Sequence, residues 1–174
     1  MDIFAHSIWS AIVAKKADKK LNIGKFAFFG VFPDLLAFSI PFLVLFYDYV
    51  LGYFPFVWPL SITQTAWPAN LISVFGFVKY LYPLGHSIVI FTAVFFLVRL
   101  IAGRYIWELL GWALHIFIDI FTHSATAFPT PFLWPLSDFK FLYGVRWSTP
   151  WFMILNYASL LIVFYLVFLR KKKI

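Results

Sequence analysis

Long apolar stretches constrain this chain more than any other feature of its sequence. Four of them lie within residues 26–53 and at about residues 84–100, 105–122 and 151–169. Apolar runs of about 18 residues or more with few charges can cross a bilayer hydrocarbon core, which is roughly 30 Å thick. We therefore expect an all-α, integral membrane helical bundle with about four transmembrane helices.

The composition supports this class. Only 12% of the 174 residues are charged and 63% are hydrophobic, whereas a soluble domain carries about 25% charged residues. At this length we expect one membrane-embedded domain, residues 1–174, with no separate soluble module. The chain has no cysteine, which excludes disulfides, thiolate catalysis, iron–sulfur clusters and cysteine-type zinc sites.

Two shorter segments have helical patterns without spanning length. Residues 3–14 are too short to cross a bilayer at about 1.5 Å per residue, and residues 70–82 predict an amphipathic helix on the outer surface. The outer loops, residues 54–83 and 123–150, are rich in proline and tryptophan. Tryptophan is typical of the membrane interface, so anchoring explains these residues.

The basic residues predict the orientation in the membrane. Four crossings place eleven of them on one side and leave Lys79, Lys140 and Arg146 on the other. An excess of Lys and Arg marks the cytoplasmic side, so the basic loops and the C-terminus are expected there. Membrane lipids are therefore the expected partners, and nucleic acid is not. The eleven are Lys15, Lys16, Lys19, Lys20, Lys25, Arg99, Arg104, Arg170, Lys171, Lys172 and Lys173.

Ionisable side chains inside the apolar segments are the main functional signal, because each is costly in a membrane unless it has a partner or a role. Three of them recur every four residues in the third stretch and therefore share one helix face. The others lie in the N-terminal segment, beside Pro33 in the first stretch and at the outer end of the second. The set is His6, Asp34, His86, His115, Asp119 and His123.

Neutral imidazole and carboxylate together suit Zn²⁺ or a similar divalent ion, and one ion would join several costly groups into a cluster. A hydrogen-bonded His115–Asp119 pair is the alternative, and His123 fits a ligand, a proton shuttle or a helix end equally well. On a straight helix that starts at Phe26, Asp34 would lie in the cytoplasmic half, far from His86. Pro33 and Pro41 favour an irregular helix that could bring the two together.

The motifs resemble a known family. His6, GVFPDLLAF with Asp34, YPLGHSIVI with His86, and LHIFIDIFTHS with His115, Asp119 and His123, followed by PFLWPLSDF and GVRW, are similar to the YdjM-like (DUF457) family of membrane-bound metal-dependent hydrolases. The resemblance covers most of the chain by the order of these motifs. It implies a prokaryotic cell-membrane protein.

That family is in turn similar to zinc-dependent phospholipase C and P1-type nucleases. By this similarity Asp34, His86, His115 and Asp119 would hold one metal, and Asp119 would bridge to a second ion bound by His6. The further His-xxx-Glu pair of the soluble enzymes has no counterpart, so the resemblance implies one or two ions.

The leading functional hypothesis is a metal-dependent hydrolase of a phosphoester or phospholipid. A bound Zn²⁺ would acidify its water, and a carboxylate, Asp34 first and Asp119 second, would orient or deprotonate that water. A transporter or channel for metal ions or protons is one alternative. A non-catalytic membrane protein with a structural metal or polar cluster is the other.

Overall fold

The computed structural model describes residues 1–52, 69–126 and 128–170. Its regular elements are helices, which confirms the all-α class for the described chain. Most of the first predicted outer loop, together with the lysines at 171–173, lies outside the described residues. The elements are α1 (Ile3–Ala17), α2 (Ile23–Val50), α3 (Ala69–Gly85), α4 (Ile88–Ala102), the 3₁₀ turn η2 (Trp107–Leu109), α5 (Leu110–Thr122), α6 (Pro150–Phe164) and its continuation η3 (Tyr165–Leu169).

Two helices are long and apolar enough to cross a membrane. They are α2, with 28 residues, and the 20-residue helix Pro150–Leu169 formed by α6 and η3. The end of α3 and α4 would make a third span if they act as one helix bent by 59°. Because α5 has 13 residues, it is only about 20 Å long. The described chain therefore has two or three candidate spans, and the predicted count of four is not confirmed.

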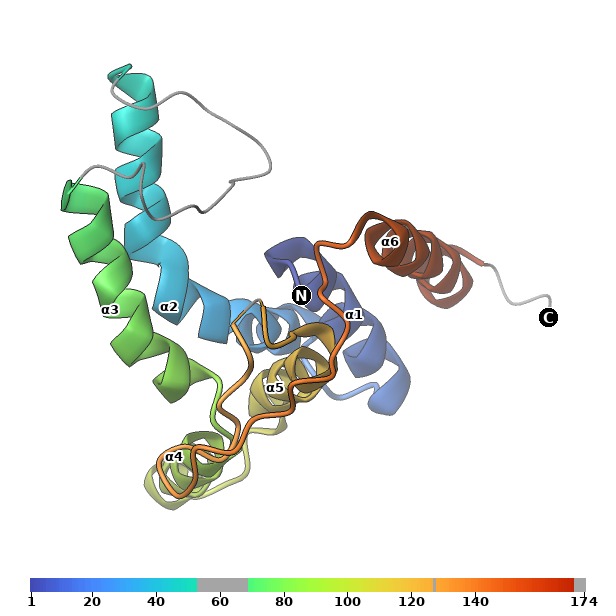
Figure 1. Cartoon of the computed structure of the whole chain (residues 1–174). Helices are drawn as coiled ribbons and strands as arrows, with labels where there is room; N and C mark the ends of the chain where they lie inside the picture. Colours follow the sequence, from blue (N-terminus) through green and yellow to red (C-terminus); the bar gives the residue numbers. More distant parts are fainter. Residues whose placement is uncertain (53–68, 127, 171–174) are drawn as a thin grey trace.

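The two predicted short helices are present. The N-terminal helix α1 begins at Ile3, where the Asp2 carboxylate accepts a hydrogen bond from the Ala5 amide at 3.0 Å. Such a side-chain cap satisfies an otherwise unpaired amide at the helix start. The segment expected as an outer interfacial helix is α3, which packs alongside the second half of α2 (Figure 1).

The bend of α2 positions the site. Figure 1 shows this helix changing direction along its length, and Pro33 and Pro41 lie inside it. Proline removes a backbone hydrogen bond and kinks a helix. The end of α3 lies close to this point, since a Cβ atom at Gly85 would be 3.1 Å from the Pro33 Cα atom. The predicted irregularity of this helix thus brings Asp34 beside the residue that follows Gly85, which is His86.

Helix α2 is the centre of the packing. It contacts α1, α3 and α5, and α6 packs against α1 (Figure 1). Phe26, Val31 and Ala37 of α2 are buried between these neighbours. The polar residues singled out by the sequence lie in α1, α2 and α5 or directly after the ends of α3 and α5.

A glycine allows α5 to approach the α2 backbone closely. A side chain at Gly111 on α5 would overlap the Phe26 carbonyl oxygen of α2. We expect Gly111→Ala to lower the free energy of unfolding by roughly 1–3 kcal/mol, because the two helices would have to separate. Thermal unfolding of the purified protein in detergent measures this. A Cβ atom at Gly76 meets nothing within 4 Å, so Gly76→Ala is the control, and equal melting temperatures for the two variants would contradict the packing argument.

Candidate metal centre

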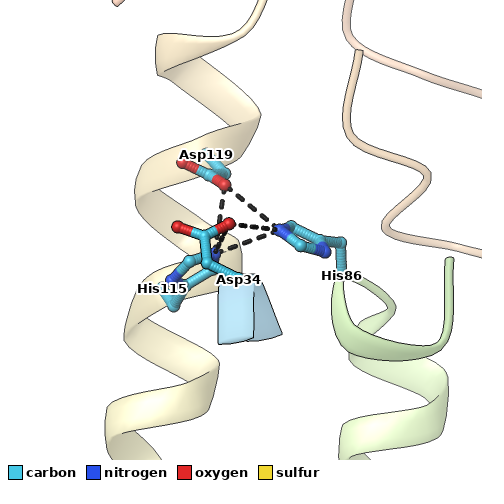
Figure 2. A group of neighbouring side chains, drawn as sticks. All are labelled: Asp34, His86, His115 and Asp119. Carbon is cyan, nitrogen blue, oxygen red and sulfur yellow. Dashed lines mark hydrogen bonds and ion pairs between the residues drawn. The ribbon is translucent and has the colours of Figure 1, made fainter. Parts of the chain in front are cut away.

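Four of the six predicted site residues meet in one buried group. Asp34 comes from α2, His86 from the break between α3 and α4, and His115 and Asp119 from successive turns of α5 (Figure 2). One ligand atom of each lies within 4.8 Å of the corresponding atom of the others. Residues separated by up to 85 positions therefore form one N₂O₂ donor set.

The distances show how tightly the group is assembled. The Nε2 atoms of His86 and His115 are 3.1 Å apart. The Asp119 Oδ2 atom lies 3.1 Å from the Nε2 atom of His115 and 3.5 Å from that of His86. The Asp34 Oδ1 atom lies 3.5 Å and 3.8 Å from the same two nitrogens. Asp34 is thus the most loosely held member of the group.

Backbone carbonyls determine which ring nitrogens point into the group. The Nδ1 atom of His86 lies 2.9 Å from the Tyr82 carbonyl oxygen, and that of His115 lies 2.8 Å from the Gly30 carbonyl oxygen. A carbonyl only accepts hydrogen bonds, so in both rings Nδ1–H donates. A neutral imidazole then has its lone pair on Nε2, as in histidines that bind metal and donate to an outer partner.

This arrangement is suited to a shared cation. Two Nε2 lone pairs face each other 3.1 Å apart, with carboxylate oxygens beside them. Within the described chain the buried Asp119 Oδ2 atom has no hydrogen-bond partner, and leaving such an atom unpaired is costly. A divalent ion would satisfy all four donors at once, and imidazole with carboxylate is a donor set that divalent metal ions accept. The residues therefore fit a metal ion.

The other two predicted ligands lie on the opposite oxygen of Asp119. The Oδ1 atom is 2.9 Å from the His6 Nε2 atom and 3.4 Å from the His123 Nδ1 atom. It also contacts the amino group of Met1 and lies 3.3 Å from the Thr122 hydroxyl. The Asp119 carboxylate thus separates two clusters of polar groups, the N₂O₂ set on Oδ2 and a second set on Oδ1.

His6 and His123 differ in their remaining contacts. The His6 ring stacks on His115 with centroids 3.7 Å apart, and within the described residues its buried Nδ1 atom has no hydrogen-bond partner. In His123, the Nδ1 atom lies 3.1 Å from the Asp119 carbonyl oxygen. Burial lowers the pKa of His123 to about 4, despite the nearby Asp119 carboxylate. This imidazole is therefore neutral at neutral pH.

Two aromatic residues that the sequence did not single out also form the site. Tyr82 stacks on the His86 ring at 3.8 Å, and the Trp112 indole donates a hydrogen bond to the Gly85 carbonyl at the α3–α4 break. Helical spacing offered a signal, because Tyr82 precedes His86 by four residues and Trp112 precedes His115 by three. Side chains at these spacings share a face.

The loop that follows α5 also contacts the elements of the site. The Ile88 amide donates to the Phe132 carbonyl at 2.9 Å, and the Val145 and Trp147 amides donate to carbonyls at the end of α5 at 2.9 and 3.0 Å. The Ser87 hydroxyl donates to the Trp134 carbonyl. These bonds hold the α3–α4 break and the end of α5 in position, and with them His86 and Asp119.

Searches of protein-family models, curated proteins and solved structures found no match to this chain.

Proposed function

We propose that this protein is a membrane-bound, zinc-dependent hydrolase of phosphoesters, with phospholipids as its substrate class. The observation that carries the proposal is the buried group of Asp34, His86, His115 and Asp119, whose Nε2 and carboxylate atoms converge on one another. The resemblance of the motifs to YdjM-like metal-dependent hydrolases supports the same function. A buried cluster of ionisable groups among apolar helices also favours function over simple packing.

The residues divide into ligands and a base. A bound Zn²⁺ would supply a more acidic water and polarise the phosphoryl oxygen. His86, His115 and Asp119 are the most closely spaced donors and hold the ion. Asp34 has the longest distances to the other donors and a 9% exposed side chain, against 1% for Asp119. Asp34 is therefore the carboxylate best able to orient the attacking water and accept its proton.

The second cluster supports a second ion. His6 and the Asp119 Oδ1 atom, 2.9 Å apart, would hold this ion, while the Asp119 Oδ2 atom belongs to the N₂O₂ set. His123 is near the same oxygen but donates its Nδ1–H to a backbone carbonyl, so only its Nε2 atom remains for a ligand or for proton transfer. In this proposal the spanning helices hold the protein in the bilayer, the basic loops face the cytoplasm and the site lies near the outer interface.

The test is whether the protein hydrolyses phospholipids and whether this activity depends on a bound metal ion. Protein purified in detergent should release phosphate from dioleoyl phosphatidic acid, or a phosphorylated head group from phosphatidylcholine, lose this activity on dialysis against a chelator, and regain it with Zn²⁺. Release of inorganic phosphate or head group, measured by mass spectrometry, gives the rate. Bound metal without hydrolysis of either lipid or of 4-nitrophenyl phosphate would exclude a phosphoester hydrolase and favour a structural or transported ion.

A further inference from the structure

An apolar groove lies beside the metal centre. It has a volume of about 300 Å³ and lies between α1, α5 and α6. Its walls include Trp9 and Val13 from α1, Ile118 from α5 and Phe152 from α6. A volume of this order is at the lower end of those that bind small ligands.

Two lining residues also contact Asp119, so a single layer of residues lies between the groove and the metal centre. Met1 lines the groove and its amino group contacts the Asp119 Oδ1 atom. Thr122 lines the groove and its hydroxyl lies 3.3 Å from the same oxygen. A molecule in the groove would therefore lie one residue away from the carboxylate that joins the two clusters of the site.

The chemistry of the walls favours a hydrocarbon chain. None of the side chains that line the groove is charged, and the Trp9 indole already donates to the Asn156 amide oxygen at 3.0 Å. A sugar or nucleotide here would lose hydrogen bonds to water without replacing them, and the volume is too small for a helix, which is about 10 Å wide. One wall belongs to α6, which together with η3 forms an apolar helix long enough to cross a bilayer. The bilayer is a source of hydrocarbon chains.

We propose that this groove holds an acyl chain of the lipid substrate, so that the phosphoester head group lies at the metal centre. This inference rests on the proposed function and narrows it. It identifies the substrate as an amphiphilic lipid and the groove as the binding site of its acyl chain. The enzyme would then act on lipids that enter sideways from the bilayer between α1 and α6.

Filling the groove tests the proposal. Val13 lies at the groove edge and is 37% exposed, so Val13→Trp fills the groove with little disturbance of the core. We expect kcat/KM for dioleoyl phosphatidic acid to fall at least about tenfold, since losing a few methylene contacts has effects of this size. The rate for 4-nitrophenyl phosphate, which has no chain, should stay within about twofold of wild type. Ile154→Trp, on an exposed part of α6 away from the groove, is the matched control.

A labelling experiment in the wild-type protein requires no variant and no turnover. Phosphatidic acid with a diazirine in its acyl chain should label Trp9, Val13 or Phe152 on illumination, and excess unlabelled dioleoyl phosphatidic acid should prevent this. Labelling spread evenly over α2, α4 and α6, or a cross-link of the groove to a second copy of the chain, would overturn the groove assignment. So would equal loss of both activities in a folded Val13→Trp protein.

The two proposals fail differently. If the wild-type protein hydrolyses neither 4-nitrophenyl phosphate nor the lipids, the hydrolase proposal fails and the labelling pattern alone decides the groove. If the wild-type protein hydrolyses 4-nitrophenyl phosphate and the lipids but Val13→Trp leaves the rate of lipid hydrolysis unchanged, the hydrolase proposal holds and the groove assignment is wrong.

Discussion

The His115→Ala/Asp119→Ala protein should bind almost no metal, whereas the wild-type protein should hold about one or two equivalents. This variant removes two of the four converging donors, including the carboxylate whose Oδ2 atom has no hydrogen-bond partner in the described chain. The remaining Asp34 and His86 atoms, 3.5 Å apart, would be left as a two-ligand site. Metal analysis by mass spectrometry after purification without added metal, and again after reconstitution with Zn²⁺, measures the effect.

The control for this experiment is Asp138→Ala, which removes an exposed carboxylate of the second outer loop. Its metal content should equal that of the wild type. A ligand that binds only the folded protein raises the melting temperature, so a chelator should lower it in the wild type and in Asp138→Ala but not in the double variant. Absence of metal from all three proteins, even after reconstitution, would exclude the metal centre and leave a hydrogen-bonded helix-packing network.

The second large effect is expected for Asp34→Asn. An amide oxygen can still approach a metal ion, but asparagine cannot accept a proton from water, so hydrolysis should fall roughly 10²–10⁴-fold. Metal content should fall much less than in the double variant, because His86, His115 and Asp119 keep their positions. Parallel measurement of bound zinc and of phosphate release from dioleoyl phosphatidic acid separates the two effects.

The comparison between carboxylates decides the role of Asp34. Asp119→Asn should reduce metal content and activity together, because the Asp119 oxygens contact both clusters. If Asp34→Asn also loses metal and activity in equal proportion, Asp34 is a ligand only and the base must be another group. Wild-type activity in Asp34→Asn would remove it from the reaction altogether.

The membrane class and the helical architecture could be predicted from local sequence. Apolar runs and sparse charge are properties of neighbouring residues, and they indicated α2 and the helix Pro150–Leu169 as spans. The third predicted span did not reach spanning length, because η2 and α5 form separate elements and the helix proper has only 13 residues. An apolar pattern alone does not show where a helix begins.

Part of the site was also predictable from the sequence. Spacing by four residues put His115 and Asp119 on one face of α5, and their cost in an apolar segment made them functional candidates. His86 and Asp34 were identified by the same cost. The resemblance also implied that His6 lies apart from the other four ligands, whereas the position of His123 beside the same Asp119 oxygen was left open by the sequence.

The sequence by itself determined which residues are too polar for their surroundings and therefore need partners. Only the tertiary structure decided which partners they have, because those depend on the bend of α2, the break before α4 and the close contact at Gly111. Helix periodicity is a local property of the backbone. The meeting of α2, α5 and the α3–α4 break depends on how side chains far apart in the chain fit together, and no local pattern encodes that fit.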